Sequence, residues 1–561
     1  MALVRFPVPT DKAMRTRSES PWAPRLTALA LLALIALPML AILWLALTGD
    51  FSAVRHLAQT VLPGSFRTTF LLMFGVGLLT LVIGTGTAWL VTMYRFPGRD
   101  IFDWLLIIPL AVPTYIVAFC YVDWLDFSGP LQTGLRHVFG WQSARDYVFP
   151  EIRSLPGAIV VMALVLYPYV YLSARASFIQ QSVCVLEVAR TLGRTAGETF
   201  WQIALPLAWP ALAAGAALAT MECLNDIGAV EYLGVNTLTV SVYTTWLERS
   251  SLGGAAQLAV MILAIVLLLF WLEHTLRGRR QFHHTTGKFT QMPPIPLAGW
   301  QRWGAALACA LPVAFGFVLP LWVLAQGAFE NVSEAFAGDF WRAMRNSVGL
   351  GLGTALLAAG AALALAYAHR TAGGRLTRFA VQVSGLGYAI PGTILAVGLL
   401  VPIAGFDNWL DAWMRETFGV SSGLLLSGSI AILLIAYTIR FMAVSLGAVQ
   451  SGYTRLSTSL DAAARTLGET RLGTFRLVHG PLLRPAIATA ALLVFVDTMK
   501  ELPATLLLRP FDFSTLATRV YDFADLGQFE EATLAALIIV AIGLVPVLVL
   551  HRTVVTGRAG A

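Results

Sequence analysis

The chain contains the stretch LEVARTLGRTAGETFWQIALPLAWPA at residues 186–211, and a second version of it, DAAARTLGETRLGTFRLVHGPLLRPA, at residues 461–486. Twelve of the 26 aligned positions are identical at an offset of 275 residues. Two unrelated apolar stretches would share far fewer. Because self-similarity at a fixed offset indicates an internal repeat, the sequence predicts a protein made of two equivalent halves.

The repeat extends beyond this stretch at a slightly larger offset of 278 residues. The further matches, first half before second, are Arg67 with Arg345, Ala111-x-Pro113 with Ala389-x-Pro391, Thr237-Leu238 with Thr515-Leu516, and Tyr243 with Tyr521. They lie before and after the central stretch, so we expect the duplication to cover most of both halves.

The composition indicates a membrane protein. Of the 561 residues, 57% are hydrophobic and only 12% are charged, whereas soluble domains carry about a quarter charged residues. The low charge excludes a disordered chain, and four cysteines in this length exclude a small disulfide scaffold. The basic residues do not cluster among aromatic residues, so we expect no nucleic-acid partner.

Apolar runs close to the roughly 20 residues that cross a bilayer occur twelve times. They lie near residues 26–47, 69–93, 104–122, 155–174, 205–221, 255–272, 303–326, 347–368, 380–404, 424–445, 485–496 and 532–550. The fold class expected is therefore an all-α polytopic membrane protein with about twelve spans, six in each half.

The distribution of lysine and arginine predicts the orientation. With the N-terminus inside, the cytoplasmic segments hold 26 of the 38 basic residues and the external segments hold 12. Both termini are then cytoplasmic. Because six is an even number, the two halves face the same way and form a parallel repeat about an axis along the membrane normal.

The expected domain organisation follows from these spans. A cytoplasmic tail (1–25) precedes the first half (26–272), a polar and basic cytoplasmic linker (273–302) joins it to the second half (303–550), and a short tail (551–561) ends the chain.

The repeated stretch lies on the cytoplasmic side, between the fourth and fifth spans of each half, and its spacing suits a short helix followed by a turn. In the first copy, Glu187 stands where a carboxylate favours the positive end of a helix. The small Ala189 permits close contact with another surface, and Gly193 can adopt the positive φ that ends a helix. Leu205-Pro206 then begins the next span, where proline loses no hydrogen bond.

This pattern resembles the EAA loop of ABC importer permeases, E-A-A-x3-G-x9-I-x-L-P, at residues 187–206. The second copy, at residues 462–481, retains Ala464, Gly468 and Pro481. It departs from the pattern where Ala462 replaces the glutamate, with Asp461 one position earlier, and where Gly480 replaces the leucine. An amphipathic loop on the lipid headgroups is the alternative, but it requires neither this spacing nor a duplicate.

The resemblance implies a transport subunit rather than an enzyme. In that family the short helix docks in a cleft of a separate ATPase subunit, so two copies of a cytoplasmic ATPase are the expected partners. The chain has no Gly-x4-Gly-Lys-Ser/Thr loop, so ATP and Mg are expected in that partner, and no cofactor, metal site or catalytic residue is expected here. A periplasmic substrate-binding protein and a bacterial inner-membrane location are also implied.

Polar residues at the ends of the fifth spans are candidates for the translocation pathway or its outer mouth. They are Glu222, Asn225, Asp226 and Glu231 in the first half, and Lys500 and Glu501 in the second. Charged residues in membrane surroundings tend to line a pathway or pair with a partner, and the carboxylates would attract a cation. The alternative is a solvated rim with a local salt bridge such as Lys500–Glu501.

The sequences around these polar residues, and the fusion of two halves in one chain, resemble those of ferric iron transport permeases. Fe³⁺ prefers oxygen ligands such as carboxylates. Permeases for thiamine, putrescine or sulfate share much of the pattern and remain alternatives. A secondary transporter with twelve spans in two parallel repeats is the alternative of another class, but the spans hold too few charged residues for an evident proton or sodium relay.

Overall fold

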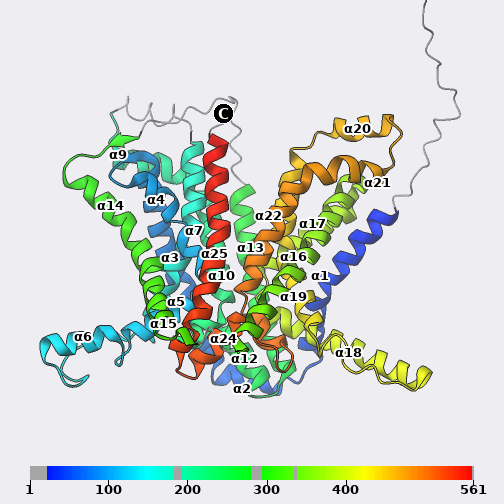
Figure 1. The fold of residues 1–561 in the computed structure, drawn as a ribbon, viewed down its shortest axis with the longest axis horizontal. Coiled ribbons are helices and arrows are strands. Elements are labelled where there is room, and N and C mark those ends of the chain that lie inside the picture. Colours follow the sequence, from blue (N-terminus) through cyan, green and yellow to red (C-terminus); the bar gives the residue numbers. More distant parts are fainter. Residues whose placement is uncertain (1–21, 182–192, 279–293, 334–337, 559–561) are drawn as a thin grey trace, which may run out of the picture.

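The computed structural model describes residues 22–181, 193–278, 294–333 and 338–558 (Figure 1). Within these residues, eleven helices are long and apolar enough to cross a membrane, and a bent pair of helices makes up to twelve. The prediction of an all-α polytopic membrane protein is confirmed. Helices predominate because hydrocarbon offers no hydrogen bonds, so the backbone of each span must satisfy its own polar groups.

The first half begins with a spanning helix and continues through five further spans. Its elements are α1 (Trp22–Thr48), α2 (Ser52–Gln59), α3 (Leu62–Met93), β1 (Tyr94–Arg95), α4 (Arg99–Leu105), η1 (Ile108–Ala111), α5 (Thr114–Leu125), α6 (Pro130–Phe139), α7 (Leu155–Gln180), α9 (Ala196–Thr199), η2 (Phe200–Ala204), α10 (Leu205–Asn225), α11 (Ile227–Tyr232), α12 (Leu238–Leu247) and α13 (Leu252–Gly278).

The second half follows the same order. Its elements are β2 (Ile295–Pro296), α14 (Trp300–Val313), η3 (Ala314–Val318), α15 (Leu319–Glu330), α16 (Gly338–Ala372), α17 (Gly374–Leu386), η5 (Gly387–Ala389), α18 (Gly392–Phe418), α19 (Ile430–Thr454), α20 (Thr458–Thr466), α21 (Arg471–Thr474), η6 (Phe475–His479), α22 (Gly480–Met499), α23 (Pro503–Leu508), α24 (Leu516–Asp525) and α25 (Phe529–Arg558). β1 and β2 pair in parallel.

The third span of each half is broken at its proline. The sequence predicted uninterrupted spans near 104–122 and 380–404, and this part of the prediction is wrong. Pro113 and Pro391 have nearly identical backbone angles, with φ of −59° and −54° and ψ of 140° at both. Proline forces the residue before it out of helical geometry. In the first half the two arms of the span meet at 91°.

The fifth spans are longer than their apolar runs. The apolar runs predicted from the sequence cover only residues 205–221 and 485–496, whereas the helices extend over Gly197–Asn225 and Arg471–Met499. The π-helical turns η2 and η6 join the cytoplasm-predicted segment to α10 and α22 without a break. Each fifth span is therefore a continuous rod that begins in the repeated stretch.

The two halves are interlocked by their first helices. α1 packs against α16, α17 and α18 of the second half, and α14, η3 and α15 pack against α3, α5 and α7 of the first. Glycine makes two of these contacts close: a Cβ atom on Gly398 would lie 2.4 Å from the Pro38 carbonyl oxygen, and one on Gly316 would lie 2.4 Å from that of Leu164. Neither half can separate without losing a helix that covers the other.

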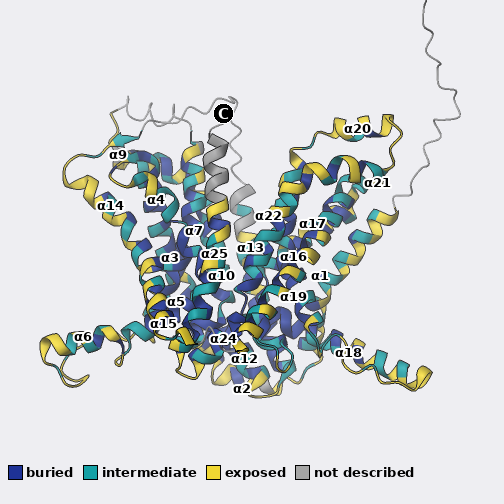
Figure 2. Cartoon of the chain, viewed as in Figure 1, coloured by how far each residue is buried: buried dark blue, intermediate teal, exposed yellow. Residues whose placement is uncertain are grey.

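The halves diverge toward the end that carries α20 and meet at the opposite end, around α12 and α24 (Figure 1). At that opposite end, α6 and the last part of α18 point outward on opposite sides. Burial is concentrated between the helices, while exposed residues lie on their outer surfaces (Figure 2). Large apolar side chains such as Phe70, Phe74 and Leu356 are among those exposed, as expected for surfaces that face lipid.

Close packing of α3 on α7 gives a test of the fold. A Cβ atom on Gly84 would lie 2.8 Å from the backbone nitrogen of Tyr171 and 2.9 Å from the carbonyl oxygen of Tyr167, whereas one on Gly86 would meet nothing within 4 Å. Gly84→Ala must push α7 away, so we expect it to destabilise the protein by about 1–3 kcal/mol. Gly86→Ala should be neutral or slightly stabilising. Thermal unfolding midpoints of the two detergent-purified variants check this, and equal midpoints would contradict the packing.

Candidate functional site

The two predicted docking segments are described to different extents. In the first, Glu187 and Ala189 lie outside the described residues, and Gly193 is the first residue after that gap, with a φ of +79°. Leu205 and Pro206 form the first turn of α10, as the pattern predicted. The second segment is described throughout, so the geometry below comes from that copy.

The second segment is a short helix that ends at a glycine. Ser457 begins α20, with its hydroxyl accepting a hydrogen bond from the backbone N–H of Ser459 (3.2 Å). Gly468 has a φ of +86°, and the backbone N–H of Glu469 donates to the carbonyl of Ala464 (3.0 Å). This left-handed glycine closes the helix. Pro481 then lies in the first turn of α22.

The identical residues of the two copies make the same local contacts. The hydroxyl of Thr470 accepts from the backbone N–H of Gly473 (3.0 Å), and that of Thr195 accepts from Glu198 (3.2 Å). Gly193 and Gly468 share the positive φ. The sequence identity between the copies therefore reflects the same turn and the same helix start.

α20 presents an exposed outer face at the end of the molecule where the halves diverge (Figures 1 and 2). Its neighbour Leu467 is 84% exposed and Leu460 is 38% exposed. Ala464, in contrast, is buried within the chain itself. The contact of this face with an ATPase stays a prediction.

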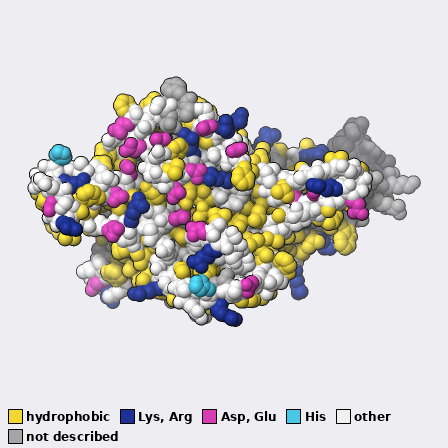
Figure 3. Space-filling view, turned by 90° about the horizontal axis from the view of Figure 1, so that it is seen from below, with side chains coloured by type: hydrophobic (Ala, Val, Ile, Leu, Met, Phe, Trp, Pro, Cys, Tyr) yellow, Lys and Arg dark blue, Asp and Glu magenta, His cyan; other side chains and the backbone are white. Residues whose placement is uncertain are grey.

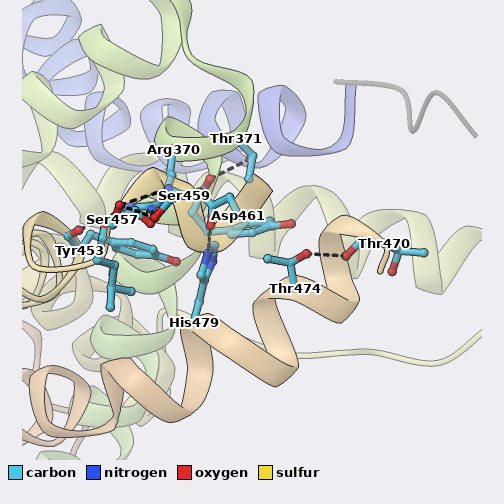
Figure 4. Close-up of polar contacts among 11 residues, drawn as sticks. Arg370, Thr371, Tyr453, Ser457, Ser459, Asp461, Thr470, Thr474 and His479 are labelled. Carbon is cyan, nitrogen blue, oxygen red and sulfur yellow. Dashed lines mark hydrogen bonds and ion pairs between the residues drawn. The ribbon is translucent and has the colours of Figure 1, made fainter. Parts of the chain in front are cut away.

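Asp461 is directed toward the chain and not toward the exposed face (Figure 4). Its carboxylate accepts hydrogen bonds from Nε of Arg370 (2.9 Å) and from Nε2 of His479 (2.5 Å). Burial raises the pKa of Asp461, but the hydrogen bonds from His479 and Arg370 outweigh it and leave the pKa below its usual value. The carboxylate is therefore ionised at neutral pH. Sequence reasoning missed Arg370 and His479, although the unexpected His479-Gly480 pair was visible as a departure from the pattern.

Five of the six predicted pathway residues line one cavity of about 110 Å³ between the two halves. These residues are Glu222, Asn225, Asp226, Lys500 and Glu501. The cavity lies where α10 and α22 end, and Pro113 at the break of the third span also borders it. Both halves contribute residues to the lining of this cavity.

The sixth residue, Glu231, lies elsewhere. Its carboxylate accepts a hydrogen bond from the hydroxyl of Tyr521 in the second half (2.7 Å). It therefore connects the halves and does not line the cavity.

The carboxylates of the cavity also begin helices. Asp226 accepts from the backbone N–H of Ala229 (2.9 Å) at the start of α11 and from the hydroxyl of Thr114. Glu501 accepts from the backbone N–H groups of Ala504 (3.0 Å) and Thr505 (3.2 Å) at the start of α23. Both residues, which match in the repeat, satisfy orphan backbone donors where the chain leaves one helix and enters the next.

The two halves meet at this point through a hydrogen bond. The side-chain oxygen of Asn225 accepts from the backbone N–H of Gly392, the first residue of α18 (2.9 Å). A Cβ atom on Gly392 would lie 2.4 Å from Nη1 of Arg440 and 2.8 Å from Oε1 of Glu501. A side chain at this position would therefore displace the ion pair of Arg440 and Glu501.

The cationic side chains of the cavity pair differently from the predicted alternative. Lys500 lies 3.0 Å from Asp497, one helical turn earlier, and not against Glu501. Glu501 instead pairs with Arg440 of α19 (3.2 Å), and both side chains are buried. Sequence reasoning missed Arg440, although a lone arginine within a predicted span is itself a signal of a functional interior.

The cavity has an excess of acidic groups. Its lining includes four carboxylates, two cationic side chains and the tyrosines Tyr115, Tyr169 and Tyr388. Glu222 has no cationic partner among the described ion pairs and lies against Tyr388. Within the described ranges, no group of three or more histidine, cysteine, aspartate or glutamate side chains could hold a metal ion.

Comparison with known proteins identifies the family and several relatives. Residues 80–281 and 351–558 each match the model of the "binding-protein-dependent transport system inner membrane component". The chain is 26% identical to the Fe(3+)-transport system permease protein FbpB 2 of Haemophilus influenzae over 517 residues, which cover 90% of this chain and 92% of the relative.

Other relatives match about one half of the chain. The sulfate transport system permease protein CysT of Salmonella typhimurium is 29% identical over 220 residues, which cover 38% of this chain and 76% of the relative. The molybdate/tungstate transport system permease protein WtpB of Thermococcus kodakarensis is 23% identical over 252 residues, which cover 45% and 93%. With the family domain found in both of its six-span halves, the chain belongs to the inner membrane components of binding-protein-dependent transport systems, the ABC-type permeases, as a fused duplicate.

Proposed function

We propose that this chain is the membrane-spanning subunit of an ATP-driven importer that carries ferric iron into the cytoplasm. An external binding protein delivers the substrate, and two copies of a separate ATPase, which hold ATP and Mg, supply the energy. The acidic cavity between the halves is the observation that carries this proposal. Because the cavity lies where the fifth spans end, a movement of either α10 or α22 would change its volume.

The proposed mechanism is alternating access between the halves. Each fifth span is one continuous helix from the repeated stretch to the cavity. A movement of α20 reaches Lys500 through the short turn of residues 467–470 and then along the continuous fifth span. Because helices are stiff, closure of the two ATPases would change the separation of the halves around the substrate.

The charge of the cavity favours a cation as substrate. Four carboxylates against two cationic side chains would repel sulfate or molybdate and attract a positive ion. Carboxylate and phenol oxygens, such as those of Glu222 and Tyr388, are the hard ligands that Fe³⁺ prefers. The relative that spans both halves is named for Fe(3+) transport, which supports the same choice. Thiamine and putrescine are also cations, so they are the substrates to compete against.

The end of the protein around α12 and α24, opposite the end that carries α20, is the proposed docking face for the binding protein. Viewed from that end, acidic and basic side chains lie together over the surface (Figure 3). A mixture of both signs suits a polar, reversible contact with a soluble partner.

Gly468 tests the coupling to the ATPase. Its φ of +86° is unfavourable for side chains with a Cβ atom, although open space surrounds it. Gly468→Val should distort the end of α20, at a cost of about 1–2 kcal/mol or more, and reduce both co-purification of the ATPase and substrate-stimulated ATP hydrolysis. Gly468→Asn is the matched control because asparagine tolerates left-handed geometry. Gly193→Val and Gly193→Asn should behave in the same way as the corresponding Gly468 variants. Undiminished ATPase binding in both valine variants would contradict the docking role.

Uptake by vesicles that contain the complete transporter tests the substrate. Ferric iron should be taken up with ATP, and excess thiamine, putrescine or sulfate should not compete. Glu222→Gln should reduce iron uptake, whereas Glu222→Asp, which keeps the charge, should retain most of it. Uptake of sulfate in place of iron would overturn the choice of a cation, and uptake without any ATPase would overturn the ATP-driven mechanism.

A further inference from the structure

The second docking helix is held by a charged cluster that connects it to three spans (Figure 4). Asp461 of α20 lies between Arg370, at the end of α16, and His479, in the turn that leads into α22. Arg370 also donates from Nη1 to the carbonyl of Tyr453 (3.3 Å) and from Nη2 to that of Leu456 (3.2 Å). The carboxylate of Asp461 thus ties α20 to α16 and to the start of α22, and Arg370 extends the connection to the end of α19.

The cluster is largely removed from water. The side chains of Arg370, Asp461 and His479 are 15%, 21% and 3% exposed. Because an ionised carboxylate only accepts hydrogen bonds, Nε2 of His479 must carry the hydrogen. Tyr453 packs on both partners of Asp461, with its ring 5.5 Å from that of His479 and 5.3 Å from the guanidinium carbon of Arg370. Loss of the carboxylate would leave these groups unpaired in a half-buried site.

The first half lacks the carboxylate and the imidazole of this cluster. At the offset of 275 residues, Arg370 corresponds to Arg95, but Asp461 corresponds to Leu186, His479 to Ala204 and Tyr453 to Phe178. The described part of the first half shows aromatic packing instead: the ring of Trp89 lies 5.2 Å from that of Phe178 and 5.0 Å from that of Phe200. Polar support there comes from Gln181, whose side chain donates to the carbonyl of Ala204 (2.9 Å).

We propose that Asp461 is a positioning residue that makes the second docking helix a rigid lever. This inference rests on the proposed function and concerns how the two halves receive the force. A movement of α20 is transmitted through Asp461 and its partners to three spans together. Leu186 and Ala204 stand at the positions of Asp461 and His479 in the first half, so the same ion pair cannot form there, and we expect the two ATPase contacts to be coupled unequally. Asp461 acts within the chain and not as a contact to the ATPase.

The test compares Asp461→Asn with the wild-type complex of permease and ATPase. The variant should still co-purify with the ATPase, since the exposed face of α20 is unchanged. Its substrate transported per ATP hydrolysed should fall at least about fivefold, the lower range of measured coupling effects. A spin label at the exposed position Ala462→Cys should become more mobile in the Asp461→Asn background.

Further variants separate positioning from folding. Asp461→Glu should restore coupling, and His479→Ala, which installs the residue of the first half, should lower it. Asp339→Asn breaks an exposed ion pair with Arg342 on α16 and should change neither label mobility nor coupling.

Unchanged label mobility and unchanged coupling in Asp461→Asn would overturn this inference alone. Loss of ATPase binding in Asp461→Asn, with binding kept by the wild type, would instead show that Asp461 contacts the ATPase. If no ATPase binds the wild-type chain, the proposed function itself fails.

Discussion

A chain inside hydrocarbon must satisfy every backbone N–H and C=O group from within the protein, and this constraint determines where the cavity can form. The helices are interrupted at Pro113, at Pro391 and at the ends of α10 and α22, and these interruptions converge on one place. The freed N–H groups there are bound by Asn225, Asp226 and Glu501. Several polar side chains that line the cavity thus cap the interrupted helices. In the interior of the protein, polar side chains are stable where they bind the free backbone groups at such interruptions.

The same constraint explains why the lever and the cavity are joined. A fifth span that crosses the bilayer without a break is stiff, so its two ends move together. One end lies in the repeated stretch, at Gly197 or Arg471, and the other lies at the cavity. The first helices, which cross to the opposite half, keep the bundles together while their far ends diverge (Figure 1).

The sequence alone predicted the features that depend on neighbours along the chain. The lengths of the apolar runs predicted the spans, and the repeat predicted the two halves. Gly468 and Pro481 predicted the end of the docking helix and the start of the next helix. Features that depend on distant residues were missed. Arg370 and Asp461 are 91 residues apart, and Arg440 pairs with Glu501 across two helices. Even Lys500 was assigned the wrong partner, because on a helix the residue three positions earlier lies closer than the adjacent one. The proline match at 113 and 391 was seen as a repeat and not as a break.

The differences between the halves follow a physical logic. Some positions at which each half acts alone have stayed alike, such as Thr195 and Thr470, which begin the same turn. Positions at which the halves face a shared space have diverged: Asn225 stands opposite Lys500 in the repeat, and Val165 stands in the place of Arg440. Strict symmetry would put two buried arginines around one small cavity, and like charges at short range in a poorly solvated interior repel strongly. Because both halves border one cavity, its lining does not need to repeat, and fusion of the halves into one chain fixes the unequal pairing.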